Sequence, residues 1–106
     1  MRINSGKFRG FPIRTADIAH TRPTSDKVKQ AIFNILGVSI QGSAVLDLFG
    51  GFGSLGLEAL SRGAASAVFV EKNRRCAKII EENIEKIGAE ATAVVLIEDA
   101  FDAIPQ

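Results

Sequence analysis

Residues 45–56 combine a carboxylate with a glycine-rich stretch, and this combination could bind a charged ligand. The segment reads Val-Leu-Asp-Leu-Phe-Gly-Gly-Phe-Gly-Ser-Leu-Gly, so Asp47 precedes four glycines in seven positions. Glycines lack Cβ atoms and let a ligand approach the backbone closely. Asp47 would lie at the carboxyl end of a strand, which is where open α/β sheets bind ligands. We therefore predict a ligand site at this turn.

The glycines have the spacing of a nucleotide-binding motif. Gly51, Gly53 and Gly56 match G-x-G-x-x-G, and Glu71 follows Gly51 by 20 residues. The motif follows a predicted strand and opens a predicted helix, which favours a nucleotide-type ligand. The two oxygens of Glu71 could accept hydrogen bonds from vicinal ribose hydroxyls. Alternatively, Glu71 is a solvated carboxylate at the start of the next helix.

The sign of charge at the turn favours one nucleotide over another. A carboxylate at Asp47 would repel the pyrophosphate of a dinucleotide such as NAD. It would favour the ammonium or sulfonium of S-adenosylmethionine, while the helix N-terminus favours the carboxylate of the same molecule. Asp47 could instead order the loop by accepting hydrogen bonds from turn amides, and both roles are compatible.

Asp99 ends the third predicted strand, at the same sheet edge as Asp47 and Glu71. Its carboxylate could accept a hydrogen bond from an adenine amino group, while the backbone N–H of Ala100 donates to the ring. The alternative role for Asp99 is a helix cap before Phe101. Three acids at the ends of three adjacent strands support a shared site.

Alternating strands and helices must bring these residues together. From residue 44 onward, the hydrophobic pattern predicts strands at 44–48, 67–70 and 92–97, with helices at 53–62 and 73–87. Asn73 can cap the second of these helices, which stops at Gly88. Continuous apolar strands are typical of a parallel sheet covered on both faces. Right-handed crossovers would place successive helices on one face. The fold class is therefore α/β.

An N-terminal unit precedes the predicted sheet. Residues 1–14 carry two glycines between short mixed segments, which predicts a small β-hairpin or an extended arm. Thr24 or Ser25 can then cap a helix that stops at Gly37. The apolar face predicted for this helix consists of Val28, Ala31, Ile32, Ile35 and Leu36.

Composition limits the possible classes of protein. A chain of 106 residues with 46% hydrophobic and 24% charged residues is typical of one ordinary folded domain. No apolar run approaches the roughly 20 residues that span a bilayer, so we expect no membrane contact and a cytoplasmic location. Cys76 cannot form an internal disulfide, and its helical spacing predicts a core position. We predict no metal site, and we expect His20, the sole histidine, to be a solvated loop residue.

Charge is distributed unevenly along the chain. Residues 1–30 hold seven Lys or Arg against two Asp, whereas residues 31–106 hold six basic and ten acidic residues. A basic arm on a mildly acidic body is a plausible contact for a polyanion, because each neutralised phosphate releases counterions. A solvated hairpin would account for the same charges. The arm residues that could bind RNA are Arg2, Lys7, Arg9 and Arg14.

Four segments together resemble one family. The family that they resemble is the bacterial 16S ribosomal RNA (guanine-N2) methyltransferases. The segments are the opening residues (1–10), Thr-Arg-Pro-Thr-Ser-Asp with the helix that follows (21–36), the glycine-rich segment (45–64) and Val-Phe-Val-Glu-Lys-Asn (68–73). The resemblance implies a Rossmann-like methyltransferase fold that uses S-adenosylmethionine. It also implies a division into an N-terminal hairpin and helix (1–37) and the first β-α-β-α-β half of the fold (44–106).

The resemblance also implies roles for individual residues. Asp47, Gly51 and Gly53 would hold the methionine moiety, Glu71 the ribose, and Asp99 with Ala100 the adenine. Three further residues, Thr21, Arg22 and Thr24, would lie beside the cofactor, with Arg22 or Thr24 near its carboxylate. Phe49 would pack under the turn, more as core than as a ligand contact. The implied partner is ribosomal RNA or a small-subunit assembly intermediate.

The chain departs from the family pattern in two ways. Phe52 stands where a small residue such as Ser is usual, so its ring is expected either to crowd the cofactor or to pack over it. The catalytic Asp/Asn-Pro-Pro-Tyr/Phe motif does not occur in these 106 residues, so no catalytic residue is assigned and we expect no turnover. We expect the chain to be the front part of a larger domain, able to associate with itself through an uncovered sheet edge. A fragment of an NAD-dependent oxidoreductase and a non-catalytic RNA-binding module are the alternatives.

Overall fold

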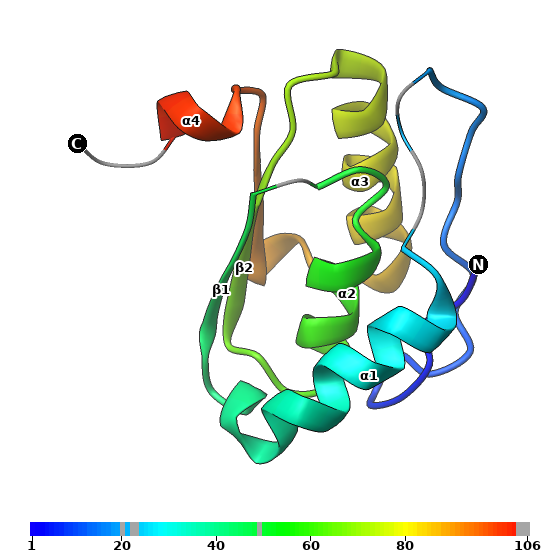
Figure 1. The fold of residues 1–106 in the computed structure, drawn as a ribbon, viewed down its shortest axis with the longest axis vertical. Helices are drawn as coiled ribbons and strands as arrows, with labels where there is room; N and C mark the ends of the chain where they lie inside the picture. The colour runs from blue at the N-terminus through cyan, green and yellow to red at the C-terminus, as the bar shows by residue number, and fades with distance from the viewer. Residues whose placement is uncertain (20, 22–23, 49, 104–106) are drawn as a thin grey trace.

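Three parallel strands form the sheet around which the chain is arranged (Figure 1). The computed structural model describes residues 1–19, 21, 24–48 and 50–103. The strands are β1 (Ala44–Asp47), β2 (Ser66–Val70) and β3 (Ala93–Leu96), in the order β1-β2-β3. Leu46 pairs with Val68, and Val68 pairs with Val94, so the three strands end at one edge. The predicted α/β fold and strand order are confirmed.

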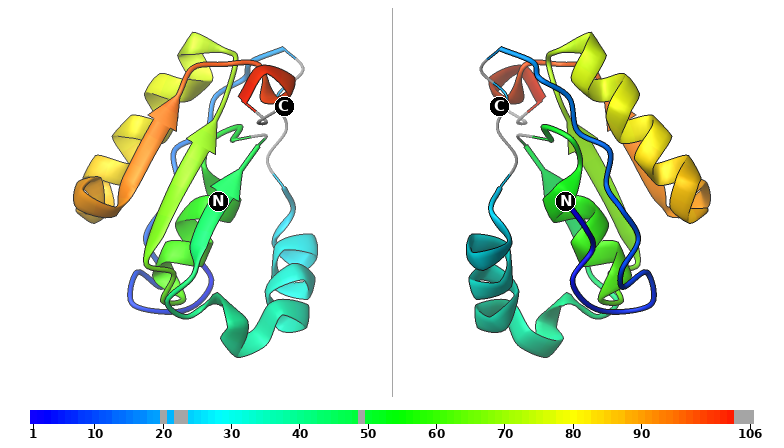
Figure 2. Two further views of the ribbon diagram at one scale, coloured as in Figure 1. Left: turned by 90° about the vertical axis from the view of Figure 1, so that its left-hand side faces the viewer. Right: turned by 90° about the vertical axis from the view of Figure 1, so that its right-hand side faces the viewer.

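Two helices connect the strands and pack on the same face of the sheet (Figures 1 and 2). α2 (Ser54–Ser61) follows the glycine turn, and α3 (Arg74–Ile87) leads from β2 toward β3. The side chain of Asn73 caps α3, and Gly88 ends it in a left-handed conformation, as predicted. The remaining short elements are η1 (Gly37–Ile40), η2 (Glu90–Thr92) and α4 (Ala100–Ala103).

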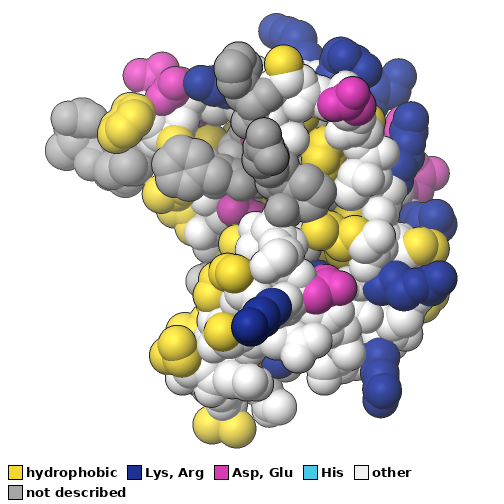
Figure 3. Space-filling model, turned by 45° about the vertical axis from the view of Figure 1, so that its right-hand side comes forward, with side chains coloured by type: hydrophobic (Ala, Val, Ile, Leu, Met, Phe, Trp, Pro, Cys, Tyr) yellow, Lys and Arg dark blue, Asp and Glu magenta, His cyan; other side chains and the backbone are white. Residues whose placement is uncertain are grey.

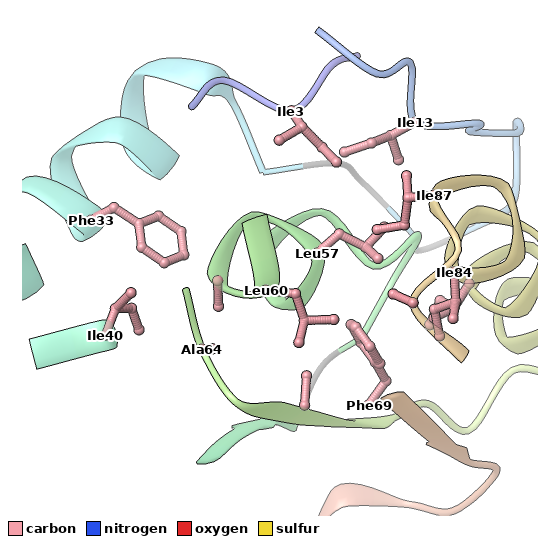
Figure 4. Packing of buried hydrophobic residues seen from close by; sticks show 14 residues of the cluster. Ile3, Ile13, Phe33, Ile40, Leu57, Leu60, Ala64, Phe69, Ile84 and Ile87 are labelled. Atoms are coloured by element: carbon pink, nitrogen blue, oxygen red, sulfur yellow. The ribbon is translucent and has the colours of Figure 1, made fainter. Parts of the chain in front are cut away.

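The larger of two apolar clusters in the described part of the chain lies between the sheet, α2, α3 and the N-terminal residues. Figure 4 shows Phe33, Ile3 and Phe69 converging on Leu57 and Leu60 of α2. Phe69 lies so close to α2 that a Cβ on Gly56 would lie 2.1 Å from its ring. Helix and strand therefore approach closely because the last glycine of the motif carries no side chain.

The second face of the sheet is exposed in the described part of the chain. Leu46 of β1 is 56% exposed and Val94 of β3 is 52% exposed, with Val68 between them. Among the described residues, β1 pairs only with β2, so its other edge is open. The sheet therefore presents both an apolar face and an unpaired strand edge.

The helix α1 (Asp26–Leu36) faces the core differently from the prediction. Ser25 caps it by accepting a hydrogen bond from the Val28 N–H, which confirms one of the two predicted caps. The residues buried on α1 are Lys29 and Phe33. The predicted apolar face is wrong, because Val28, Ala31, Ile35 and Leu36 are exposed and Ile32 is half-buried.

The physical reason lies on α2. Glu58, which is fully buried, places a carboxylate 3.3 Å from the Lys29 ammonium. The Arg62 guanidinium stacks over the Phe33 ring, 4.8 Å from its centroid. A buried carboxylate needs a cation, so α1 turns its lysine inward and leaves apolar side chains outside.

Residues 1–14 form a hairpin-like loop that is docked on α2. The paired ends make one isolated antiparallel bridge, Arg2 with Pro12, in place of regular strands. The Glu58 carboxylate accepts hydrogen bonds from the N–H groups of Asn4 and Ser5. The Ser61 backbone oxygen accepts another from the Lys7 N–H. The N-terminal segment is therefore held against the body of the protein.

None of the described helices is long and apolar enough to cross a membrane.

Candidate ligand-binding site

A pocket of about 530 Å³ lies at the carboxyl ends of the strands. Five residues predicted for the cofactor site line it: Thr21, Gly51, Glu71, Asp99 and Ala100. The apolar part of the lining is contributed by Leu48, Val70 and Phe101. A volume of this size lies within the range of sites that hold small molecules and cofactors.

The glycine turn forms one wall of the pocket. Gly51 and Gly53 have φ values of +54° and +91°, a region that other L-residues rarely adopt. The Gly53 N–H donates to the Gly50 oxygen over 2.7 Å, and the Gly50 N–H donates to the Val70 oxygen over 3.0 Å. The turn is thus closed on itself and fastened to the end of β2.

Glu71 joins the turn to the start of α3. Its Oε1 accepts a hydrogen bond from the Gly51 N–H at 2.9 Å, and its Oε2 accepts one from the Asn73 N–H at 2.8 Å. A carboxylate has about four lone-pair positions, so each oxygen can accept a further hydrogen bond. The side chain is therefore oriented by the protein and retains acceptor capacity at the pocket.

Asp99 holds the loop after β3 in a similar way. Its Oδ1 accepts a hydrogen bond from the Phe101 N–H at 2.9 Å, which places the carboxylate at the start of α4. This is the helix-cap geometry considered as the alternative role. Asp99 and Ala100 nevertheless both line the pocket, so capping and ligand binding are compatible at this position.

Asp47, Glu71 and Asp99 follow three neighbouring strands. Asp47 ends β1, is half-buried and pairs in register with Phe69, while the Glu71 N–H donates to the Leu96 oxygen at 3.0 Å. The three acids therefore share one edge of the sheet.

The other predicted site residues are placed less directly. Among the described residues, the pocket lining includes neither Asp47 nor Gly53 nor Thr24. Arg22 and Phe49 lie outside the described residues, as does His20. In the described part of the chain, no group of three or more His, Cys, Asp or Glu side chains is placed to hold a metal ion.

The expectation for Phe52 is corrected by the structure. Its side chain is 2% exposed and packs with Ile18, Cys76 and Ile79 in a second apolar cluster. It belongs to the core and is not part of the pocket lining. Cys76 is fully buried in the same cluster, which confirms its predicted core position, and its Sγ lies 3.2 Å from the Thr21 Oγ1.

The four predicted RNA-binding residues are exposed on the N-terminal segment. Two of them already have partners in the protein. The Arg14 guanidinium pairs with the Glu82 carboxylate, and the Arg2 guanidinium donates to the Gly10 oxygen at 2.9 Å. Lys7 lies over the Phe8 ring, 5.1 Å from its centroid, while Arg9 completes the exposed set.

Asn83 supports the site, and sequence reasoning missed it. Its amide donates to the backbone oxygens of Arg14 and Phe52 at 3.0 and 2.9 Å, and its Oδ1 accepts from the Arg14 N–H at 2.9 Å. This one buried side chain ties the N-terminal segment to the glycine turn. A polar residue between Ile80 and Ile84 on the apolar stripe of a helix is the signal that could have revealed it.

The three parallel strands, the glycine turn and the acids at the strand ends form a Rossmann-like α/β arrangement, and the comparison with solved structures identifies it as the methyltransferase fold. The whole chain, residues 1–106, matches the model of a protein family described as "Conserved hypothetical protein 95", and the chain belongs to that family.

Named relatives and solved structures agree with this assignment. Ribosomal RNA small subunit methyltransferase D of Escherichia coli strain K12 is 39% identical over 95 residues, which are 90% of this chain and 48% of that protein. The structure described as "Putative methyltransferase yhhF", also from E. coli, superposes with a TM-score of 0.87 at 34% identity, covering 96% of this chain and 54% of the other.

A more distant structure shares the fold alone. It is an RNA methyltransferase from Salinibacter ruber in complex with S-adenosyl-L-homocysteine, with a TM-score of 0.70 at 20% identity, covering 77% of this chain and 53% of the other. The present chain spans about half the length of the curated relatives that it matches first.

Proposed function

We propose that this chain supplies the S-adenosylmethionine-binding part of an enzyme that methylates the exocyclic amine of a guanine in small-subunit ribosomal RNA. The observation that carries the proposal is the pocket that Gly51, Glu71 and Asp99 line together, with Glu71 hydrogen-bonded to the Gly51 N–H. The names of the relatives support ribosomal RNA methylation, and the distant structure with S-adenosyl-L-homocysteine supports the cofactor. The choice of guanine comes from the sequence resemblance.

The volume and the lining of the pocket suit an adenosine. Leu48, Val70 and Phe101 offer apolar surface to a purine, and Asp99 with the Ala100 N–H offers an acceptor and a donor at its edge. Glu71, oriented by two backbone N–H groups, would accept hydrogen bonds from the ribose hydroxyls. These residues bind and orient the ligand.

The methionine end of the cofactor would face the glycine turn. The turn and the N-terminus of α2 favour a carboxylate, while the Asp47 carboxylate at the end of β1 favours a cation in the same region. S-adenosylmethionine carries both charges, and when bound it supplies an electrophilic methyl group. Thr21 lies in the pocket lining, and Arg22 and Thr24 are proposed to lie near the methionine carboxylate.

Ribosomal RNA is the proposed partner, free or in a small-subunit assembly intermediate. The exposed arm residues Arg2, Lys7, Arg9 and Arg14 are proposed to contact its phosphates. Because ribosomal RNA is modified where ribosomes are assembled, the proposal implies a cytoplasmic location. Catalytic residues are not assigned, and the chain by itself is expected to bind weakly and to show no turnover.

The test is a titration with S-adenosyl-L-homocysteine. Calorimetry measures the affinity, and the backbone amide NMR signals of an isotope-labelled sample report which residues bind. We expect shifts at Gly51, Glu71 and Ala100. Asp47→Ala and Glu71→Ala should each weaken binding about tenfold or more, because a hydrogen bond or contact to a charged group is lost. Glu81→Ala, which removes an exposed carboxylate of α3 outside the pocket, is the matched control and should bind normally.

Three outcomes would contradict the proposal. Unchanged affinity in both pocket variants would remove the site from these residues. If the chain binds NADH but not S-adenosyl-L-homocysteine, a dinucleotide-dependent enzyme is favoured. The pyrophosphate of NADH would then be shown to bind in spite of the Asp47 carboxylate. If the chain binds ribosomal RNA in a salt-dependent way but binds neither S-adenosyl-L-homocysteine nor NADH, an RNA-binding module without a cofactor is favoured.

A further inference from the structure

The charges of α3 are arranged against the preference of the helix. Arg74 and Arg75 occupy its first turn, Lys72 lies just before the Asn73 cap, and the first turn contains no acidic residue. The N-terminus of a helix carries partial positive charge, so cations there are repelled and anions are favoured. Helix stability therefore does not explain why these three positions hold Lys and Arg.

The opposite end of α3 is not arranged in this way. Its last turn holds Lys86 beside Glu85, so the unfavourable charges are confined to the start of the helix. The formal net charge of the chain is only +1, so the basic residues at the start of α3 are a local concentration and not part of a uniformly basic surface. A local concentration of one sign attracts a ligand of the other sign.

The cations at the start of α3 have no acidic partner in the described part of the chain. The side chains of Lys72, Arg74, Arg75 and Lys78 are exposed, and no carboxylate of the described residues lies within 4.0 Å of their charged nitrogens. The Arg14 guanidinium of the N-terminal segment differs, because it is paired with Glu82. The positive charges at the start of α3 are therefore available to a partner.

These four residues form one surface, which we call the cationic ridge. Lys72 lines the pocket, and Arg74 and Arg75 follow it after Asn73. Lys78 is three residues beyond Arg75 and lies on the same side of the helix. Figure 3 shows Lys and Arg side chains following one another along the upper margin of the molecule and down its right side. Because Lys72 lines the pocket and the other three residues lie in the first two turns of α3, the ridge runs from the pocket onto this helix.

We propose that the cationic ridge of Lys72, Arg74, Arg75 and Lys78 binds the phosphate backbone of the RNA substrate beside the cofactor pocket. The inference rests on the proposed function and adds to it a contact surface outside the N-terminal arm. Each phosphate that a lysine or arginine neutralises releases condensed counterions, so the contact contributes affinity that falls as salt rises. The ridge positions the RNA and carries no base specificity.

The test compares two double variants that each remove two positive charges. Arg74→Ala with Arg75→Ala removes the centre of the ridge. Lys27→Ala with Lys86→Ala removes exposed lysines from α1 and from the last turn of α3, and serves as the matched control. Binding of a fluorescently labelled RNA hairpin is measured by anisotropy at several salt concentrations. S-adenosyl-L-homocysteine binding and the thermal midpoint are measured on the same samples.

The ridge variant should lower the slope of log K against log salt by about 1.4 to 1.8, from two lost phosphate contacts. Between 50 and 200 mM salt, the wild-type affinity should then fall about tenfold more than the affinity of the variant. The control should keep the wild-type slope, as should Arg74→Lys with Arg75→Lys. The thermal midpoint of the ridge variant should be unchanged or raised, since two cations leave a positive helix end.

The inference is overturned if the ridge variant keeps the wild-type slope, if both double variants lower it equally, or if the wild-type chain does not bind the RNA. The nucleotide titration separates this failure from failure of the proposed function. If the chain binds S-adenosyl-L-homocysteine but shows no ridge-dependent RNA binding, the cofactor site is supported and only the proposal for the ridge is wrong. If the chain shows ridge-dependent RNA binding but binds no nucleotide, the proposed cofactor site is wrong instead.

Discussion

The Lys29 ammonium lies 3.3 Å from the Glu58 carboxylate, and neither side chain has any contact with solvent. Lys29 also donates to the Arg2 backbone oxygen at 3.0 Å and to the Ser54 Oγ at 3.2 Å. One buried cation therefore connects α1, the N-terminal segment and the first residue of α2. Because α2 begins directly after the glycine turn, this pair supports the wall of the pocket from behind.

Lys29→Met should destabilise the protein strongly. Removing one partner of a buried ion pair costs about 3–5 kcal/mol of unfolding free energy. We expect the lower end of this range, because Glu58 keeps its ion pair with Arg62 at 2.9 Å. Urea denaturation followed by circular dichroism measures this loss. In a double-mutant cycle with Glu58→Gln, the two losses should not add, because both variants break the same contact between Lys29 and Glu58. Losses that add fully would show that the two side chains stabilise the protein independently of each other.

Gly56→Ala should strain the contact between α2 and β2. A Cβ at this position would lie 2.1 Å from the Phe69 ring, so helix and strand must separate. Such overpacking costs about 1–3 kcal/mol, measured as a lower urea midpoint. Gly56→Ala should cost less unfolding free energy in a Phe69→Leu background than in the wild-type chain, because the smaller side chain leaves room for the added Cβ. If Gly56→Ala has wild-type stability, the close approach described here is not required.

Asn83→Ala should loosen the N-terminal segment and the glycine turn together. The variant leaves the Arg14 N–H and the oxygens of Arg14 and Phe52 without their buried partner. We expect a loss of about 2–3 kcal/mol and faster hydrogen exchange at both segments. Asn83→Asp keeps an acceptor for the Arg14 N–H but has no donor for the Phe52 oxygen. Hydrogen exchange should therefore speed up more in the glycine turn than at the Arg14 amide. Faster exchange at only one segment in Asn83→Ala would mean that the two are not coupled.

The 106-residue chain should associate with itself through its open edge and apolar sheet face. Among the described residues, the outer edge of β1 is open, and Leu46 of β1 and Val94 of β3 are exposed on one face of the sheet. Unpaired edges and large apolar patches promote pairing between chains. Sedimentation velocity should show concentration-dependent dimers or larger species, and Leu46→Lys with Val94→Lys should reduce them. Monomers at all concentrations in the wild-type chain would contradict the prediction.

Local patterns in the sequence were enough to predict the elements that carry the site. Asn73 and Gly88 mark the ends of α3 because a side-chain cap and a left-handed glycine act within one helical turn. The apolar runs predict the strands to within one or two residues, and parallel pairing then brings Asp47, Glu71 and Asp99 to one edge. Each of these inferences needs only neighbouring residues and the chirality of the chain.

The tertiary structure decided what depends on partners distant in the sequence. Periodicity alone predicts an apolar inner face for α1, but a buried carboxylate from α2 draws Lys29 inward instead. Phe52 turns into a cluster with Ile18, away from the pocket, and Asn83 finds partners almost 70 and 31 residues away. Burial of a charge or an amide is tolerated only where a complementary group meets it, and that meeting is a property of the folded chain.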